Sequence, residues 1–469
     1  MNMRIESDSI GSRELPAEVY YGVQSLRAME NFPITGRRVR GEMIVSLALL
    51  KKACAITNAS AGVVDKGIAD AIEAACDRVI AGQHHDAFIV DPIQGGAGTS
   101  TNMNANEVIA NIAIEILGGK PGDYSIVHPN DHVNYGQSTN DIIPSAGKMT
   151  ALTLLEGLEE SLEKLRDALK RKGREFDGII TMGRTQMQDA VPIRLGQEFN
   201  AYATAIDRGL RRIRSTKTEL YTINLGGTAI GTGLNADATY FRNIVATLSA
   251  LTGVPYHQAR DLVDSTQNID SFSAVSGALK AVALAMSKIA NDLRLMSSGP
   301  RTGFGEINLP AMQNGSSIMP GKVNPVIPEV VSQVAYKVAG NDMCIAMAAE
   351  AGQLELNAFE PVVFDCLFES ITMLTGAADT FVLNCIDGIT ANAERCRALV
   401  EGSVGTITAL CPHIGYARAA KLAKEALASG IGVHQLILEQ GILSREELDT
   451  ILNAYSMTEP GISGKRPME

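Results

Sequence analysis

The 469-residue chain contains no tryptophan, and aromatic residues make up only 5% of it. An alanine-rich chain with few aromatic residues favours closely packed helices, because alanine has the lowest free-energy cost in a helix. Basic residues are also in the minority, since 41 Lys and Arg stand against 52 Asp and Glu, for a formal net charge of −11. This balance argues against a nucleic-acid partner, because phosphate binding requires concentrated Lys and Arg.

Paired cysteines and long apolar runs are also missing. The seven cysteines are scattered and form no CxxC pair, which favours reduced thiols in the cytosol over a disulfide framework. The opening segment, MNMRIESDSIGSRELP, has no apolar core of the kind found in signal peptides. No uninterrupted run of about eighteen apolar residues occurs. We therefore expect a cytoplasmic protein that does not span a membrane.

Three regions of the sequence differ in the length and spacing of their helical patterns. Residues 1–140 contain short helical patterns separated by stretches rich in Gly, Pro and Asn, and residues 141–395 hold the long helical patterns. Residues 396–469 contain short helical patterns with turns between them. The sequence therefore predicts a mixed, mainly helical N-terminal domain, a central domain of long helices and a small helical C-terminal domain.

The central region carries apolar seams of near-heptad period. The members of these seams recur at spacings of three and four residues, and a shorter pattern of the same kind follows Pro328, which is suited to the first turn of a helix. They are Leu155, Leu158, Leu162, Leu165 and Leu169; Val275, Leu279, Val282, Met286, Ile289, Leu293 and Met296; and Val331, Val334 and Val338. Such seams pack helices at shallow angles and can also join subunits. We expect an all-α bundle that forms oligomers.

Four polar segments that contain glycines lie between the stretches with helical patterns. They are GGAGTSTNMNANE (95–107), HVNYGQSTND (132–141), GRTQMQDA (183–190) and GSSIMPGKVNP (315–325). Together they offer hydroxyl, amide and backbone N–H donors and one isolated cation, Lys322, which suit a small dicarboxylate. The same residue types are common in ordinary turns and helix caps, so any one segment taken alone leaves both interpretations open.

Signatures of other kinds of site are incomplete. GGAGTS lacks the ending of a phosphate-binding loop, and GGTAIGTG (226–233) is not followed by a βαβ pattern. The adjacent pair His84–His85 cannot bind a metal from one helical face, and neither HExxH nor GxSxG occurs. His132 and His413 are expected to form hydrogen bonds rather than to bind a metal. We expect neither a metal nor a cofactor.

The segment GSSIMPGKVNP closely resembles the signature loop of the aspartase/fumarase superfamily, and the resemblance extends over essentially the whole chain from YYGVQSLRAMENF (20–32) onward. It implies a three-domain fold of the aspartase/fumarase type. It also implies a homotetramer whose long helices form a twenty-helix core, with active sites that are each built from three subunits.

Within the superfamily, several features are similar to the aspartase branch rather than to fumarases. These include the motif YYGVQSLRAMENF and the continuation from Val326 to Val330 after the signature loop. Gln186 occupies a position where fumarases and some aspartases have His, and Tyr135-Gly136 departs from the commoner pair. The resemblance implies reversible removal of ammonia from L-aspartate to give fumarate.

The resemblance also assigns a role to each candidate residue. Ser316 would be the general base, acting as an alkoxide. The carboxylate that becomes an enediolate would be held by Thr99, Ser138, Thr139 and Ser317. The α-carboxylate would be held by Thr185, Lys322 and Asn324, and the amino group would lie near Asn140 and Gln186.

Three other functions fit the same sequence. A class II fumarase would use the same base to add water to fumarate. A non-catalytic structural homologue is possible because one branch of the superfamily serves as a lens crystallin, although the signature residues Ser316, Lys322 and Asn324 are intact. A lyase that acts on a substituted aspartate is the third.

Overall fold

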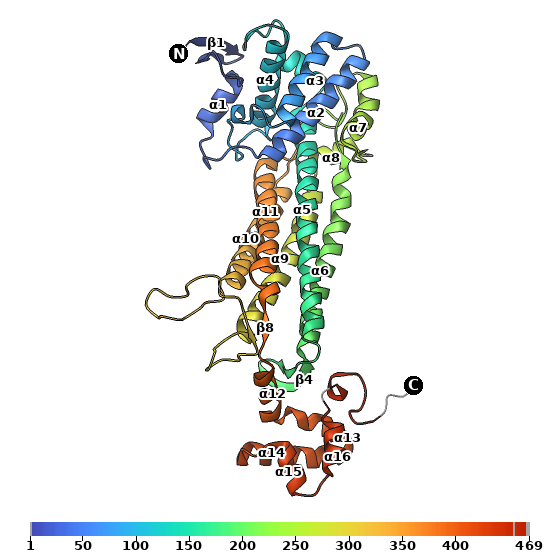
Figure 1. The fold of residues 1–469 in the computed structure, drawn as a ribbon. Helices are drawn as coiled ribbons and strands as arrows, with labels where there is room; N and C mark the ends of the chain where they lie inside the picture. Colours follow the sequence, from blue (N-terminus) through green and yellow to red (C-terminus); the bar gives the residue numbers. More distant parts are fainter. Residues whose placement is uncertain (1, 454, 466–469) are drawn as a thin grey trace. The chain divides into compact units, whose positions relative to one another are not determined.

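The structure is a computed structural model that describes residues 2–453 and 455–465, so the outermost ends of the first and third predicted domains lie outside it. The chain divides into two compact units (Figure 1). Unit 1 comprises Met1–Glu159, Arg211–Ala281 and Tyr336–Leu374, and unit 2 comprises Glu160–Leu210, Val282–Ala335 and Thr375–Glu469. The predicted three-domain division stays a prediction.

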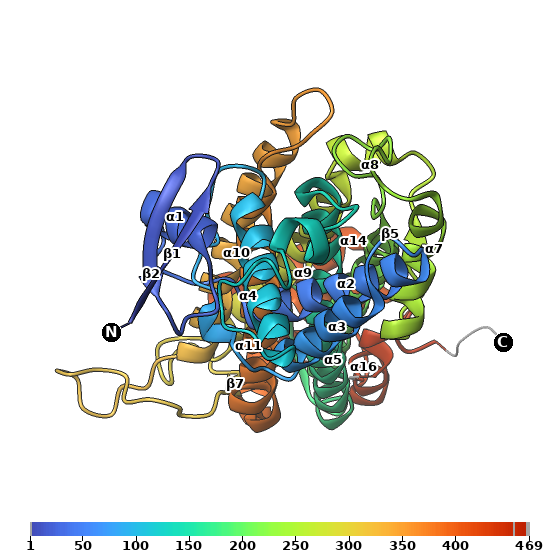
Figure 2. The same ribbon diagram turned by 90° about the horizontal axis from the view of Figure 1, so that it is seen from above.

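Unit 1 begins with an antiparallel hairpin and continues mainly as helices. Its elements are β1 (Met3–Asp8), β2 (Gly11–Pro16), α1 (Val23–Asn31), α2 (Gly41–Ser60), α3 (Lys66–Ile80), α4 (Thr99–Ile116), β5 (Thr222–Ile223), α7 (Ala238–Thr252), β6 (His257–Gln258) and α8 (Leu262–Gln267). Helix α2 packs against α3 and α7, and α3 also packs against α4 (Figure 2).

The predicted seams lie on three of the five longest helices. These five are α5 (Thr139–Glu175), α6 (Leu195–Lys217), α9 (Asp270–Met296), α10 (Val326–Glu350) and α11 (Glu360–Asn384). The seams lie on α5, α9 and α10. At about 1.5 Å per residue, α5 alone is about 55 Å long. The leucine seam of α5 is fully buried, and the α9 seam is buried except for Met296, which is half-buried. The predicted long, apolar-faced helices are confirmed, and Pro328 lies in the first turn of α10 as expected.

Glycines let these helices approach closely at two crossings. In unit 1, a Cβ on Gly147 of α5 would overlap the ring of Phe364 of α11. In unit 2, a Cβ on Gly209 of α6 would lie 2.7 Å from Cγ2 of Val282 on α9. Because real side chains do not approach that closely, glycine is needed at both crossings.

Three helical segments, Gly41–Ser60, Asp270–Met296 and Glu360–Gly388, are long and apolar enough to cross a membrane by length and composition. Of their most apolar windows, 67%, 56% and 50% of the residues are buried within the protein. Packing against other helices therefore accounts for much of their apolar character. The expectation that no segment spans a membrane stays a prediction.

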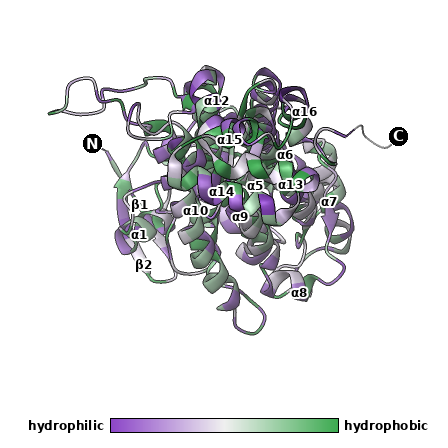
Figure 3. Ribbon diagram, turned by 90° about the horizontal axis from the view of Figure 1, so that it is seen from below, coloured by the Kyte–Doolittle hydropathy of each residue, from purple (hydrophilic) through white to green (hydrophobic). Residues whose placement is uncertain are grey.

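Unit 2 adds one hairpin, a short antiparallel strand pair between segments far apart in the sequence, and a group of small helices. The elements are β3 (Ile180–Thr185), β4 (Gln188–Arg194), β7 (Ile307–Asn308), β8 (Thr390–Ala391), α12 (Ala393–Gly402), α13 (Ile407–Ile414), α14 (Tyr416–Ser429), α15 (Val433–Glu439) and α16 (Arg445–Ile451). Leu410, Leu422, Leu436 and Leu448 belong to a small core between the last four helices. Hydrophilic and hydrophobic residues both occur along these helices (Figure 3), as expected of helices with one buried face.

Candidate active site

The ten predicted site residues divide between the two units. Unit 1 holds Thr99, Ser138, Thr139 and Asn140, whereas unit 2 holds Thr185, Gln186, Ser316, Ser317, Lys322 and Asn324. These residues lie in loops, at the first residues of helices or, for Thr185, at the end of strand β3, and not within apolar seams.

In unit 1 the beginnings of two helices meet. Helix α4 begins at Thr99 and α5 begins at Thr139, and the side-chain amide of Asn102 donates a hydrogen bond to Thr139 Oγ1 at 3.3 Å. The loop before α4 turns sharply, since Gly96 and Gly98 have φ angles of 87° and 85°. Helix N-termini present free N–H groups and the positive end of the helix dipole. This corner of unit 1 is therefore suited to a carboxylate.

A buried lysine supports the same corner from behind. Lys51 is fully buried in α2, and its Nζ donates to Oδ1 of Asn134 at 2.9 Å and to Oε1 of Gln137 at 2.8 Å. Burial lowers the pKa of Lys51 to about 8. Asn134 Oδ1 also accepts from Asn102, so one amide joins α2, α4 and the loop before Ser138.

The signature loop of unit 2 is built around Ser316. The Ser316 Oγ accepts the backbone N–H groups of Ile318 at 3.2 Å and Met319 at 2.9 Å. Two backbone donors directed at one hydroxyl oxygen favour negative charge on that oxygen. The motif identifies Ser316, and the structure adds its two backbone donors.

Glycine and asparagine close this loop on itself. The side-chain amide of Asn324 donates to the carbonyl oxygen of Gly315 at 2.6 Å. A Cβ at Gly315 would overlap the carbonyl oxygen of Lys322, so the two ends of the loop meet only because residue 315 has no side chain. The Asn324 side chain therefore helps to close the loop. Because its NH₂ group faces the Gly315 carbonyl oxygen, its own Oδ1 faces away from that oxygen.

Lys322 and Asn324 line a cavity of about 1100 Å³ in unit 2. Arg294 lines the same cavity and forms an ion pair of 3.8 Å with Glu329, which also lines it. The side-chain amides of Asn308 and Asn392 in this lining hydrogen-bond to each other. Ser317 and Lys322 are exposed. The cavity therefore offers donors of the kinds that bind carboxylates.

Thr185 and Gln186 lie at the tip of the β3–β4 hairpin. Gln186 and Met187 form a two-residue turn with φ angles of 54° and 63°, and both side chains are exposed. The hairpin is anchored by an ion pair of 3.0 Å between Arg184 and the buried Glu306. Among residues 2–453 and 455–465, no side-chain hydrogen bond joins Thr185 or Gln186 to the Ser316 loop.

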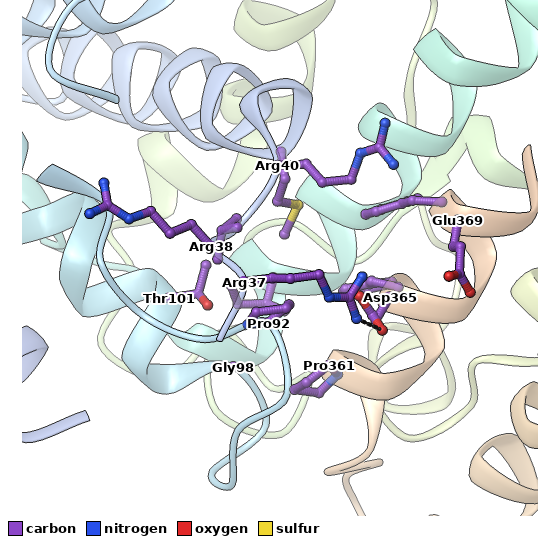
Figure 4. A pocket seen from close by; sticks show the side chains of 14 residues that line it. Arg37, Arg38, Arg40, Pro92, Gly98, Thr101, Pro361, Asp365 and Glu369 are labelled. Atoms are coloured by element: carbon purple, nitrogen blue, oxygen red, sulfur yellow. Dashed lines mark hydrogen bonds and ion pairs between the residues drawn. The ribbon is translucent and has the colours of Figure 1, made fainter. Parts of the chain in front are cut away.

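A separate pocket of about 270 Å³ in unit 1 contains none of the ten predicted residues (Figure 4). Its lining includes Arg37, Arg38 and Arg40 together with apolar residues of α5 and α11. Arg37 points toward Asp365 and forms an ion pair of 2.6 Å with it. The guanidinium of Arg37 is therefore already neutralised within the pocket.

Histidines form hydrogen bonds as the sequence predicts. His132 Nδ1 accepts the backbone N–H of His128 at 2.9 Å, and His413 Nε2 lies 2.8 Å from the Ser463 carbonyl oxygen. In the described part of the chain, no group of three or more His, Cys, Asp or Glu side chains is arranged to hold a metal ion. The seven cysteines are free.

Comparison with known proteins connects these loops to a family. The family described as Lyase matches residues 11–340, and the family described as Fumarase C C-terminus matches residues 407–459. The chain belongs to the aspartase/fumarase superfamily. All four predicted polar segments fall inside the first match.

The similarity covers nearly the full length of individual relatives. The chain is 53% identical to the aspartate ammonia-lyase of Bacillus subtilis over 466 residues, which cover 99% of this chain and 98% of that protein. The structure of a fumarate lyase:delta crystallin from Brucella melitensis bound to cobalt is 48% identical, with a TM-score of 0.96 over 98% of this chain and all of that one. A class II fumarase from Schistosoma mansoni is 36% identical, with a TM-score of 0.93 over 98% of this chain and all of that one. The predicted fold class is confirmed.

The predicted residues did not include the supporting side chains. Lys51, Asn102 and Asp141 hold the loops in place and were not among the predicted site residues. The sequence did contain an indication for Lys51, because this lysine lies among the apolar residues of α2. A charged residue in such a position is buried only if it has hydrogen-bond or ion-pair partners.

Proposed function

We propose that this protein catalyses the reversible deamination of L-aspartate to fumarate and ammonia. The observation that carries the proposal is the loop serine Ser316, whose Oγ accepts two backbone N–H groups. The 53% identity to a protein named aspartate ammonia-lyase supports the choice of substrate.

The chemistry requires a base and a group of donors. Removal of a proton from the carbon next to the side-chain carboxylate puts a second negative charge on that carboxylate, which becomes an enediolate. Donors directed at this oxygen pair lower the barrier because they are strongest when the charge develops. We assign this task to Thr99, Ser138, Thr139 and Ser317.

The remaining residues would hold the rest of the substrate. Thr185, Lys322 and Asn324 would bind the α-carboxylate, and Asn140 and Gln186 would lie near the amino group. Lys322 also supplies positive charge near Ser316 in the sequence, which would favour the alkoxide together with the N–H groups of Ile318 and Met319. The alkoxide would take the carbon-bound proton, after which the C–N bond breaks and ammonia leaves.

The quaternary structure is part of the proposal. We infer a cytoplasmic homotetramer whose active sites each use segments of three subunits. An exposed apolar stripe on α10 supports an assembly: Tyr336, Met343 and Met347, here called the α10 stripe, are 62%, 63% and 66% exposed and lie on one face of the helix. Apolar side chains aligned in this way on a long helix are typical of an interface.

The experiment that tests the proposed function is a comparison of two substrates. Purified protein is incubated with L-aspartate or with L-malate, and fumarate is followed by its ultraviolet absorbance. Fumarate from aspartate alone is the expected result. Fumarate from malate alone would establish the second candidate, a class II fumarase, which the similarity to the Schistosoma mansoni enzyme favours. Activity on neither substrate would favour a substituted aspartate or a structural role.

A further inference from the structure

The carboxylate of Asp141 joins two segments that lie far apart in the sequence. Asp141 is fully buried in the first turn of α5. Its Oδ1 accepts the N–H of Ser138 at 2.9 Å, and its Oδ2 accepts the N–H groups of Gly226 and Thr228, each at 3.1 Å. One side chain therefore fixes both the predicted substrate-binding loop and the loop 226–229.

The loop 226–229 is strained where Asp141 holds it. Thr228 has a φ of 56°, a left-handed conformation that is unusual for a β-branched residue, and its buried Oγ1 has no hydrogen-bond partner in the described residues. Both features cost free energy. Hydrogen bonds to an ionised carboxylate are strong enough to offset such a cost.

The strained loop in turn sets the orientation of Asn140. The Ala229 carbonyl oxygen lies 2.7 Å from the side-chain nitrogen of Asn140. A carbonyl oxygen can only accept a hydrogen bond, so the NH₂ group of Asn140 must face Ala229, and Oδ1 faces away from it. The backbone of Asn140 is held as well, because the buried Asn224 donates to its carbonyl oxygen at 2.9 Å.

The Asn140 Oδ1, an acceptor held in this orientation, matches the amino group of the proposed substrate. An ammonium group has only donors, whereas both carboxylates of aspartate have only acceptors. In the described part of the chain, no protein donor is bonded to Asn140 Oδ1. We propose that Asp141 is a positioning residue that, through Thr228 and Ala229, orients the Asn140 amide so that Oδ1 receives the amino group of the substrate. This inference rests on the proposed function and deepens it.

The test uses the addition of ammonia to fumarate. In that direction ammonium and fumarate are separate substrates, so the binding of each has its own KM. In the Asp141→Asn variant, an amide replaces the carboxylate, and its NH₂ group would face at least one of the three N–H donors. We expect the KM for ammonium to rise about tenfold or more, as for the loss of one hydrogen bond to a charged group. The KM for fumarate should rise clearly less, although not by zero, because Asp141 also holds the N–H of Ser138. Equal increases of both KM values, or no change in the KM for ammonium, would overturn the proposal.

Glu107→Gln is the matched control. Glu107 is also a buried carboxyl that accepts several backbone N–H groups, but these come from Gly22, Gln24 and Ser25. Its replacement should leave the ratio of the two KM values unchanged. A control variant that raises the KM for ammonium selectively would show that any buried carboxyl has this effect, which would overturn the assignment to Asp141.

Two further measurements keep the proposal testable if Asp141→Asn does not fold or if the wild type is not an aspartase. Asn140→Ala changes a half-buried side chain and should raise the KM for ammonium alone; an unchanged value would overturn the proposal. Amide hydrogen exchange at Gly226 and Thr228 needs no substrate, and the account predicts faster exchange in Asp141→Asn than in the wild type. Equal exchange would show that Asp141 does not hold the loop, whereas absent wild-type activity on aspartate would refute the proposed function alone.

Discussion

At the scale of single residues, the buried carboxyl of Glu107 gives a pH dependence of stability. Burial raises the pKa of Glu107 from 4.5 to about 7, against the opposing effect of the hydrogen bond from Ser25. A carboxyl whose pKa is higher in the folded state stabilises the fold below pH 4.5, and this contribution is lost as the pH rises to about 7. The loss is on the order of 3 kcal/mol.

The neutral variant Glu107→Gln should not show this loss. We expect the unfolding free energy of the wild type to fall relative to the variant between pH 4.5 and about 7 and to run parallel to it at higher pH. Denaturant unfolding at a series of pH values measures the difference. A constant difference across this range would contradict the assigned pKa.

Lys322 provides a second prediction for a single side chain. Lys322→Ala removes the cation proposed to bind the α-carboxylate, and a hydrogen bond to a charged group contributes about 1.5–3 kcal/mol. We expect the KM for aspartate to rise about 10- to 100-fold with a smaller change in kcat. Steady-state kinetics on aspartate measure both, and an unchanged KM would remove Lys322 from the α-carboxylate site.

The partners of single residues were the part that the sequence predicted least. Ser316 was identified by its motif, but the donors from Ile318 and Met319 depend on the path of the backbone. Lys51 was not identified because its partners, Asn134 and Gln137, are more than 80 positions away in the sequence. Periodicity and motifs describe neighbours along the chain and do not reveal such contacts.

At the scale of elements, the signature loop depends on the absence of a side chain at Gly315. Gly315→Ala would force the loop open, because the new methyl group overlaps the carbonyl oxygen of Lys322. A displacement of about 1 Å can reduce turnover about 100-fold, so we expect a loss of that size in kcat. The melting temperature should stay near that of the wild type, because the loop is mostly exposed and contributes little to the core.

The matched control is Gly157→Ala on an exposed part of α5. An added Cβ there meets no atom within 4 Å, and alanine is favoured over glycine in a helix by about 1 kcal/mol. Its kcat should equal that of the wild type. Full activity of Gly315→Ala, compared with this control, would show that the closed loop is not needed for catalysis.

The long helices were predicted well, whereas the β3–β4 hairpin was not. Apolar residues at spacings of three and four identify α5, α9 and α10, because one buried face determines the pattern. The hairpin turn uses Gln186 and Met187 at positive φ, where glycine or asparagine would be the usual signal. Without that signal the segment was recognised only as polar.

At the scale of the whole molecule, the α10 stripe should determine the oligomeric state. The double variant Met343→Glu/Met347→Glu places two charges on this stripe, and burying unpaired charges in an interface is strongly unfavourable. We expect the wild type to have the mass of a tetramer and the variant to dissociate into smaller species. Size-exclusion chromatography with light scattering measures both masses.

Ile10→Glu is the control for this prediction, because Ile10 is 75% exposed but lies in the turn between β1 and β2. It should keep the mass of the wild type. A double variant that also keeps that mass would show that the α10 stripe is not an interface. A monomeric wild type would contradict the proposed assembly as a whole.

The membership of the superfamily was predicted correctly from the motifs, and relatives over 98% or more of the chain confirm it. The assembly stays a prediction, because apolar seams that face the core of one chain and seams that join subunits have the same periodicity. The division of site residues between two units was also not visible in the sequence, since motif spacing carries no distance in space.

The most direct test of the central claim is the rate of fumarate formation from aspartate by Ser316→Ala, compared with the wild type at equal protein concentration. Within the described residues, the Ser316 Oγ bonds to two backbone N–H groups of its own loop, so the variant should fold and melt like the wild type. Loss of the general base should lower kcat by about 10²–10⁴-fold. A folded Ser316→Ala protein that forms fumarate at the wild-type rate would contradict the claim that Ser316 is the base.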